Sequence, residues 1–176
     1  MRNIVVDLSA EGIERAIREV REYKEWLERK TVELRNRIAE VIQTNADSGF
    51  NSSPVEVLPI EGVQIGTVDV TIEEDGDVTV VVANGEDAVW IEFGAGVYYN
   101  GSVGASPNPL VSENGLPFTI GSMSNSNPYK LGWKFKGEDG EYHFTHGTPA
   151  SMPFYNAVQG VINDIASIAR EVFSNP

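Results

Sequence analysis

The chain has 176 residues, of which 41% are hydrophobic and none is cysteine, and its formal net charge is −13 at pH 7. This length and hydrophobic content fit one domain, 1–176, with a core of its own. The lack of cysteine excludes disulfides, zinc–thiolate sites and thiol catalysis. Because no apolar run approaches the ~18 residues of a membrane span and no secretory leader pattern is present, we expect a soluble protein made in a reducing cytoplasm, without membrane contact.

The negative charge is unevenly distributed. Residues 1–46 hold equal numbers of basic and acidic side chains, so the net charge lies in residues 47–176. A surface with so few cations gains little from releasing the counterions of nucleic-acid phosphates, which disfavours ordinary nucleic-acid binding. Two interpretations stay open: a solvated acidic face, or a wall past which DNA slides without binding.

A long helix is predicted over about 10–46, after a short β-branched stretch at 3–8 and with Ser9 as its N-cap. Its apolar residues recur close to a 3.5-residue repeat that is interrupted at Lys24 and Thr31: Ile13, Ile17, Val20, Leu27, Leu34, Ile38 and Val41. We expect the helix to end at 47–49. Its length of about 55 Å exceeds the roughly 40 Å diameter of a compact domain of this size. Either it kinks near Lys30, or one end overhangs and meets a neighbour.

Two β-hairpins and a second helix follow. The first hairpin has strands at 63–72 and 78–82 around an acidic turn at 73–77. The second has strands at 131–136 and 141–145, with four aromatic residues available for cross-strand pairing: Trp133, Phe135, Tyr142 and Phe144. Ser151 is the expected N-cap of the last helix, which carries Pro153 in its first turn and a wide apolar stripe over 154–173. The fold class is therefore α+β, with a long N-terminal helix and a C-terminal helix packed on a mainly antiparallel sheet built from hairpins.

Neither a metal site nor a cofactor site is expected. The acidic turn at 73–77 lacks the ligand spacing of a calcium loop, and His143 and His146 have no third ligand nearby in the sequence. Glu92 stands between two hydrophobic residues, as a general acid or as a structural carboxylate satisfied by backbone donors. The lack of a partner acid, or of a histidine close in sequence, favours the structural role.

The segment 94–132 is rich in Gly, Ser, Asn and Pro and is nearly uncharged. A loop this long inside a compact domain is usually functional or disordered. Its apolar content is too high for a linker, so we expect an insertion that orders against a partner or a sister subunit. The candidate interface residues are Tyr98, Tyr99, Leu110, Leu116 and Phe118.

Two blocks place large apolar residues directly beside glycine or proline, and neither contains a plausible nucleophile and base. The first reads W-I-E-F-G-A-G at 90–96 and the second G-T-P-A-S-M-P-F-Y-N-A at 147–157. Their chemistry is that of positioning, and no catalytic residue is assigned. The residues that define the two blocks are Trp90, Glu92, Phe93, Gly94, Gly96, Gly147, Pro149, Pro153 and Phe154.

These blocks, with the order of strand, long charged helix, hairpin, loop and last helix, resemble the tail-completion or head-to-tail joining proteins of long-tailed, lambdoid-type phages and prophages. The resemblance covers the layout of most of the chain and about twenty residues in detail. Ala95 stands where the family usually has threonine, and 97–132 is longer than in compact members. The resemblance implies an α+β subunit that forms a ring, commonly a hexamer, at the neck between head and tail, with no catalysis and no cofactor.

Three functions are open. The favoured one is a virion structural protein, assembled in the host cytoplasm and located in the neck or tail. Its partners would be other copies of itself, a head–tail adaptor, and tail-tube or tail-terminator proteins, while DNA passes through without specific binding. The second is a small host- or protein-interaction module that uses the loop at 97–120. The third is a hydrolase that uses Glu92 with His143 or His146.

Overall fold

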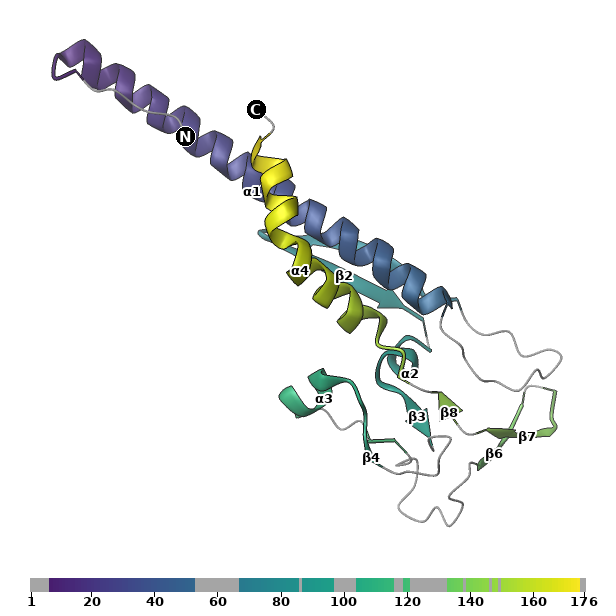
Figure 1. Ribbon diagram of the computed structural model, residues 1–176. Helices are drawn as coiled ribbons and strands as arrows, with labels where there is room; N and C mark the ends of the chain where they lie inside the picture. Colours follow the sequence, from purple (N-terminus) through teal and green to yellow (C-terminus); the bar gives the residue numbers. More distant parts are fainter. Residues whose placement is uncertain are drawn as a thin grey trace. The chain divides into compact units, whose positions relative to one another are not determined.

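The computed structural model describes residues 7–52, 67–85, 87–96, 104–115, 119–120, 133–137, 139–145, 147–148 and 150–174 (Figure 1). The predicted α+β class is confirmed. In chain order the elements are α1 (Ala10–Ser52), β1 (Asp69–Asp75), β2 (Val78–Asn84), α2 (Ala88–Phe93), β3 (Ala95–Gly96), β4 (Gly104–Ala105), α3 (Pro109–Glu113), β5 (Thr119–Ile120), β6 (Trp133–Lys136), β7 (Tyr142–Thr145), β8 (Gly147–Thr148) and α4 (Pro153–Ser174). The strands pair antiparallel as β1–β2, β3–β8, β4–β5 and β6–β7. The strand expected at 3–8 falls mostly outside the described residues.

The chain divides into two compact units, Met1–Ile38 with Asp164–Pro176, and Ala39–Asn163. In the first unit, the N-terminal helix packs against the C-terminal helix, whereas the sequence predicted that both pack on a sheet. The ring of Trp26 on α1 meets Phe173 on α4 edge-on, with 5.8 Å between the ring centroids. Tyr23 stacks on the same tryptophan at 5.5 Å.

In the second unit, the β1–β2 hairpin lies along the C-terminal part of α1 (Figure 1). The core combines buried residues from α1, the first hairpin, α2 and α4: Ala46, Phe50, Val68, Val70, Ala88, Ile91 and Ala157. The side-chain amide of Gln43 donates to the backbone carbonyl of Val70 at 2.7 Å. A two-stranded hairpin is marginal alone in water, so the apolar face of the helix supplies the cover it needs.

The start of α1 agrees with the sequence, whereas its predicted end is wrong. The hydroxyl of Ser9 accepts a hydrogen bond from the Gly12 backbone N–H at 3.1 Å, which confirms the expected N-cap. The helix then continues past Gly49 to Ser52. Phe50 is buried in the core, and a Cβ on Gly49 would lie 2.9 Å from Cβ of Pro153. This glycine therefore permits a close approach of α1 to the start of α4 and does not end the helix.

The apolar stripes of both long helices are covered less than predicted. On α1 the buried side chains include Ala39, Ala46 and Phe50, which lie off the predicted repeat. The first four residues of that repeat are exposed: Ile13, Ile17, Val20 and Leu27. On α4 the residues Ala157, Val161 and Val172 are buried, but Val158, Ile162 and Ile165 are exposed. The physical reason is the size of the sheet: the described strands form separate two-stranded pairs, which cover a narrower strip of helix than one larger sheet would.

Both predicted hairpins are confirmed, with corrections to their details. The first turns more tightly than expected, because the acidic residues 73–75 belong to β1 and the turn is left to Gly76, with φ of 57°, and Asp77. In the second, the register does not pair the four aromatic residues with one another. Each of the four lies opposite a different kind of residue. The pairs are Trp133 with Thr145, Lys134 with Phe144, Phe135 with His143 and Lys136 with Tyr142.

The segment 94–132, expected as one long loop, contains regular structure. The elements β3, β4, α3 and β5 all fall inside it. Asn108 caps α3 by accepting a hydrogen bond from the Leu110 backbone N–H at 3.0 Å. Residues 97–103, 116–118 and 121–132 lie outside the described part of the chain. The insertion therefore has ordered elements of its own within a single chain.

Candidate functional site

The two sequence blocks come together although they are far apart in the chain. Strand β3 of the first block pairs with β8 of the second, with Ala95 opposite Thr148 and Gly96 opposite Gly147. The backbone N–H of Ser151 also donates to the carbonyl of Ile91 at 2.8 Å. The blocks therefore form one structure.

Glu92 is the side chain that joins α2 to α4. Its exposed fraction is 5%. Its two oxygens point to the first backbone N–H groups of α4. Oε2 accepts from the Phe154 N–H at 2.8 Å and Oε1 from the Tyr155 N–H at 3.1 Å. Pro153, the first residue of α4, has no N–H to satisfy. Glu92 thus performs, from another element, the work of an N-cap.

The prediction that Ser151 caps α4 is wrong. The helix begins at Pro153, one residue later than that prediction requires, and Met152 stands before it in the left-handed region with φ of 56°. Such a conformation costs about 1 kcal/mol or more for a residue other than glycine. The contacts of the Ser151 backbone with α2 and of Glu92 with α4 fix the chain on both sides of Met152, which explains why this conformation persists.

Asn108 completes the arrangement and links it to α3. Its side-chain amide donates to Oε1 of Glu92 at 2.8 Å and to the Glu92 carbonyl at 3.3 Å, and its exposed fraction is 1%. The hydroxyl of Ser106 donates to the carbonyl of Phe93 and accepts from the Asn108 N–H at 3.3 Å. We call this set the Glu92 junction: Glu92, Ser106, Asn108 and the first N–H groups of α4. It joins α2, α3 and α4 at one buried carboxylate.

Asn108 and Ser106 were missed by the sequence analysis. A local signal for Asn108 exists, because asparagine followed by Pro109 is a typical N-cap and first-position pair. That signal predicts the cap of α3. It does not predict that the other side of the amide reaches Glu92, since no spacing rule connects two residues on different elements.

The hydrogen bonds of the Glu92 junction suit this side chain to the role of a structural anchor. Burying a carboxylate without donors costs several kcal/mol, and here three N–H groups replace the lost water. The position at a helix N-terminus adds about 0.3–1 kcal/mol through the helix dipole. The arrangement can therefore hold three elements in a fixed relation. It gives Glu92 the backbone donors expected of a structural carboxylate.

The other block residues surround this junction. Trp90 lies on α2 and is 40% exposed, while Phe93 is half-buried. Gly94 ends α2 with φ of 81°, and its N–H donates to the Trp90 carbonyl at 2.8 Å. Phe154 packs edge-on against Phe50 at 5.4 Å between centroids. Phe154 thus packs on another aromatic ring, whereas Gly94 lets the chain turn at the end of α2.

Most of the predicted interface belongs to parts of the chain outside the described residues. Tyr98, Tyr99, Leu116 and Phe118 lie outside the described residues, as does Pro149 of the second block. Leu110 lies on α3 and is half-buried. The expected interface therefore stays a prediction.

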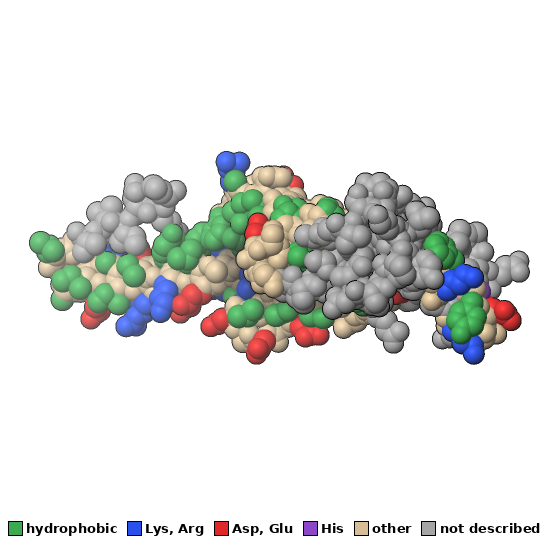
Figure 2. Space-filling view, turned by 90° about the horizontal axis from the view of Figure 1, so that it is seen from below, with side chains coloured by type: hydrophobic (Ala, Val, Ile, Leu, Met, Phe, Trp, Pro, Cys, Tyr) green, Lys and Arg blue, Asp and Glu red, His purple; other side chains and the backbone are tan. Residues whose placement is uncertain are grey.

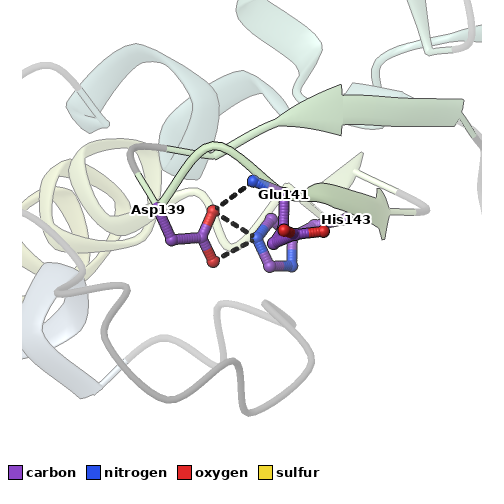
Figure 3. Close-up of polar contacts among 3 residues, drawn as sticks. All are labelled: Asp139, Glu141 and His143. Atoms are coloured by element: carbon purple, nitrogen blue, oxygen red, sulfur yellow. Dashed lines mark hydrogen bonds and ion pairs between the residues drawn. The ribbon is translucent and has the colours of Figure 1, made fainter.

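His143 forms a second polar cluster in the turn of the β6–β7 hairpin (Figure 3). Its Nε2 lies 2.8 Å from Oδ2 and 3.0 Å from Oδ1 of Asp139, whose Oδ1 also accepts from the Glu141 N–H at 2.9 Å. The hydrogen bond from His143, followed by that from the Glu141 backbone, lowers the pKa of Asp139. A Cβ on Gly137 would lie 2.7 Å from the His143 ring, so a larger residue there would displace this side chain. His146 lies outside the described residues.

The described residues contain no group of three or more metal-ligating side chains and no helix apolar enough over its length to cross a membrane. Comparison of the chain with protein-family models, curated proteins and solved structures gives no match.

Proposed function

We propose that this protein is a virion structural protein, a tail-completion or head–tail connector subunit that forms a ring at the neck or at the upper end of a phage tail. One observation carries the proposal. The two blocks that resemble this family pair with each other through β3 and β8, and both contribute to the Glu92 junction. The residues behind the resemblance thus form one structural feature.

The chemistry of the junction supports a mechanical role. A ring subunit must keep its helices in a fixed relation while neighbours bind on either side. Glu92 serves this purpose because both of its oxygens accept N–H groups, one from α3's cap residue and two from the start of α4. A hydrolase would need this carboxylate as an acid or base at its substrate, and those hydrogen bonds would have to be broken first.

The distribution of charge supports the proposed surroundings. Partners would be other copies of the chain in a ring, possibly a hexamer, a head–tail adaptor, and a tail-tube or tail-terminator protein. DNA would pass through the ring without specific binding. An acidic lining suits passage, because phosphates are repelled from it and find few cations to bind.

The proposal is tested with the tail-tube or tail-terminator protein encoded in the same phage or prophage. The full chain is mixed with assembled tail tubes, and the products are analysed by cross-linking and negative-stain electron microscopy. We expect ring-sized cross-linked species and extra density at one end of the tube. Immunogold labelling of particles should place the protein at the neck.

Three results would contradict the proposal. One is a protein that ignores tail tubes and adaptors and is absent from purified particles. Another is loss of a measurable turnover in Glu92→Gln with unchanged folding, which would favour an enzyme. The third is binding to one host protein through the loop at 97–120, lost without loss of the core when 97–103 of that loop is deleted and Ser106 and Asn108 stay in place; this would favour the interaction module.

A further inference from the structure

The N-terminal part of α1 presents a row of apolar side chains to solvent, and Figure 2 shows apolar side chains gathered along this part of the helix. We call the row the α1 stripe: Ile13, Ile17, Val20, Tyr23 and Leu27, each between 41% and 54% exposed. Scattered apolar residues on a surface need no explanation, but a continuous row over several helical turns marks an interaction site.

The spacing of the α1 stripe is that of a coiled-coil seam. Ile13, Val20 and Leu27 recur every seven residues and occupy one core position of the heptad. Ile17 and Lys24 occupy the other, one turn away. The stripe is therefore shaped to receive a second helix of the same spacing.

One edge of the stripe, at Tyr23, contacts an aromatic cluster of the fold. Tyr23 stacks on Trp26, and Trp26 in turn packs edge-on against Phe173 of α4. An interface built on side chains that are already ordered loses less conformational entropy on binding. The aromatic stack thus supports one edge of the stripe.

Charges beside the stripe decide the direction of the second helix. In a parallel pair, Lys24 of one copy would face Lys24 of the other across the seam, which is unfavourable. In an antiparallel pair it faces the apolar Ile13. Glu14 and Arg21 both occupy the e position of the heptad, beside the seam, and both are exposed. In an antiparallel pair, e positions of one helix face e positions of the other.

We propose that the α1 stripe binds the α1 stripe of a second copy of this chain in an antiparallel, two-fold pair. Ile17 of each copy packs beside Val20 of the other, and Glu14 of each faces Arg21 of the other. The charges select this register. A shift of one heptad in one direction brings Arg21 against Arg21, and in the other direction Glu14 against Glu14.

This inference is independent of the proposed ring. A two-fold contact uses the same patch on both copies and closes on itself, whereas neighbours in a ring use two different patches. The pair can therefore exist in free subunits or link two subunits that belong to different rings.

The test uses the full chain in size-exclusion chromatography with light scattering, and sedimentation velocity over a concentration series. We expect the wild type to form dimers or larger even-numbered species. Glu14→Arg and Arg21→Glu should each raise the dissociation constant about tenfold or more, because each places like charges together twice in the two-fold pair. An equimolar mixture of the two variants should regain the wild-type affinity, since both facing pairs are then opposite in sign.

Arg15→Glu is the matched control. It makes the same charge change in the same stretch of helix, but at an exposed position on the side away from the seam, so association should be unchanged. Far-UV circular dichroism checks that every variant keeps its helix content. A wild type that is monomeric throughout the series would overturn the proposal, as would single variants that associate normally or a mixture that does not recover.

Discussion

The carboxylate of Glu92 accepts three hydrogen bonds in a buried site, so its removal leaves three donors without a partner. We expect Glu92→Ala to lower the free energy of unfolding by about 2–4 kcal/mol, through loss of the cap of α4 and an unsatisfied Asn108 amide. Urea unfolding followed by tryptophan fluorescence measures this change.

Glu92→Gln separates charge from shape. The amide keeps one oxygen acceptor but turns its NH₂ toward N–H groups, so we expect a loss of about 1–2 kcal/mol, smaller than for alanine. Glu113→Ala, an exposed glutamate on α3, is the control and should change stability by less than about 0.5 kcal/mol. Equal stability of the wild type and Glu92→Ala would show that the junction does not hold α4.

Asp139 and His143 give the second polar cluster a defined pH dependence. The pKa of Asp139 is lowered in the folded protein, first by the hydrogen bond from His143. A depressed carboxyl pKa stabilises the fold above the unfolded pKa, and this contribution is lost as pH falls through the lowered folded value. In His143→Gln the carboxyl carbon signal of Asp139 should therefore titrate at higher pH than in the wild type.

The Glu141 backbone hydrogen bond remains in that variant and also lowers the pKa of Asp139. The titration should accordingly move part of the way toward the ordinary range of a free aspartate. A titration that is identical in both proteins would mean that His143 does not contact Asp139 in solution.

At the scale of elements, two glycines inside helices should respond in opposite ways to alanine. Gly49→Ala gains helix propensity but forces a Cβ within 2.9 Å of Pro153, so we expect a net loss of about 1–2 kcal/mol. Gly160 on α4 has no neighbour within 4 Å of the added Cβ, so Gly160→Ala should gain about 0.5–1 kcal/mol. Thermal unfolding of the matched pair measures both.

The same elements show why some features could be predicted from sequence and others could not. Helix α1, both hairpins and the cap at Ser9 could be predicted, because apolar periodicity, turn residues and N-cap preference involve residues close together in the sequence. The end of α1 and the start of α4 could not. Gly49 permits a close approach to Pro153, and Glu92, not Ser151, accepts the first N–H groups of α4. Each of these contacts joins residues far apart in the chain, where local propensity carries no information.

At the scale of the whole molecule, the Glu92 junction and the α1 stripe have different roles because their chemistry differs. The Glu92 junction is polar, buried and fully engaged, which suits a fixed shape. The α1 stripe is apolar, exposed and flanked by charges of both signs, which suits association that salt and concentration can adjust. Assembly and internal rigidity are thus assigned to separate parts of the chain.

This separation predicts a gradient of stability along α1. Its C-terminal part places Ala46 and Phe50 in the core, whereas Ile13, Ile17 and Val20 near its start are exposed. Helical amides are protected mainly by the packing of their side chains, because an isolated helix is marginal in water. In Arg21→Glu, at a concentration below its raised dissociation constant, amides of 10–28 should exchange about tenfold or more faster than those of 39–52.

Hydrogen exchange followed by mass spectrometry, with the wild type beside Arg21→Glu at one concentration, tests this gradient. Pairing of two copies would cover the start of α1, so the wild type should show slower exchange over 10–28 and unchanged exchange over 39–52. Arg15→Glu should match the wild type in both segments. Uniform protection along α1 in Arg21→Glu would contradict the gradient, because it would require cover for the stripe from within the single chain.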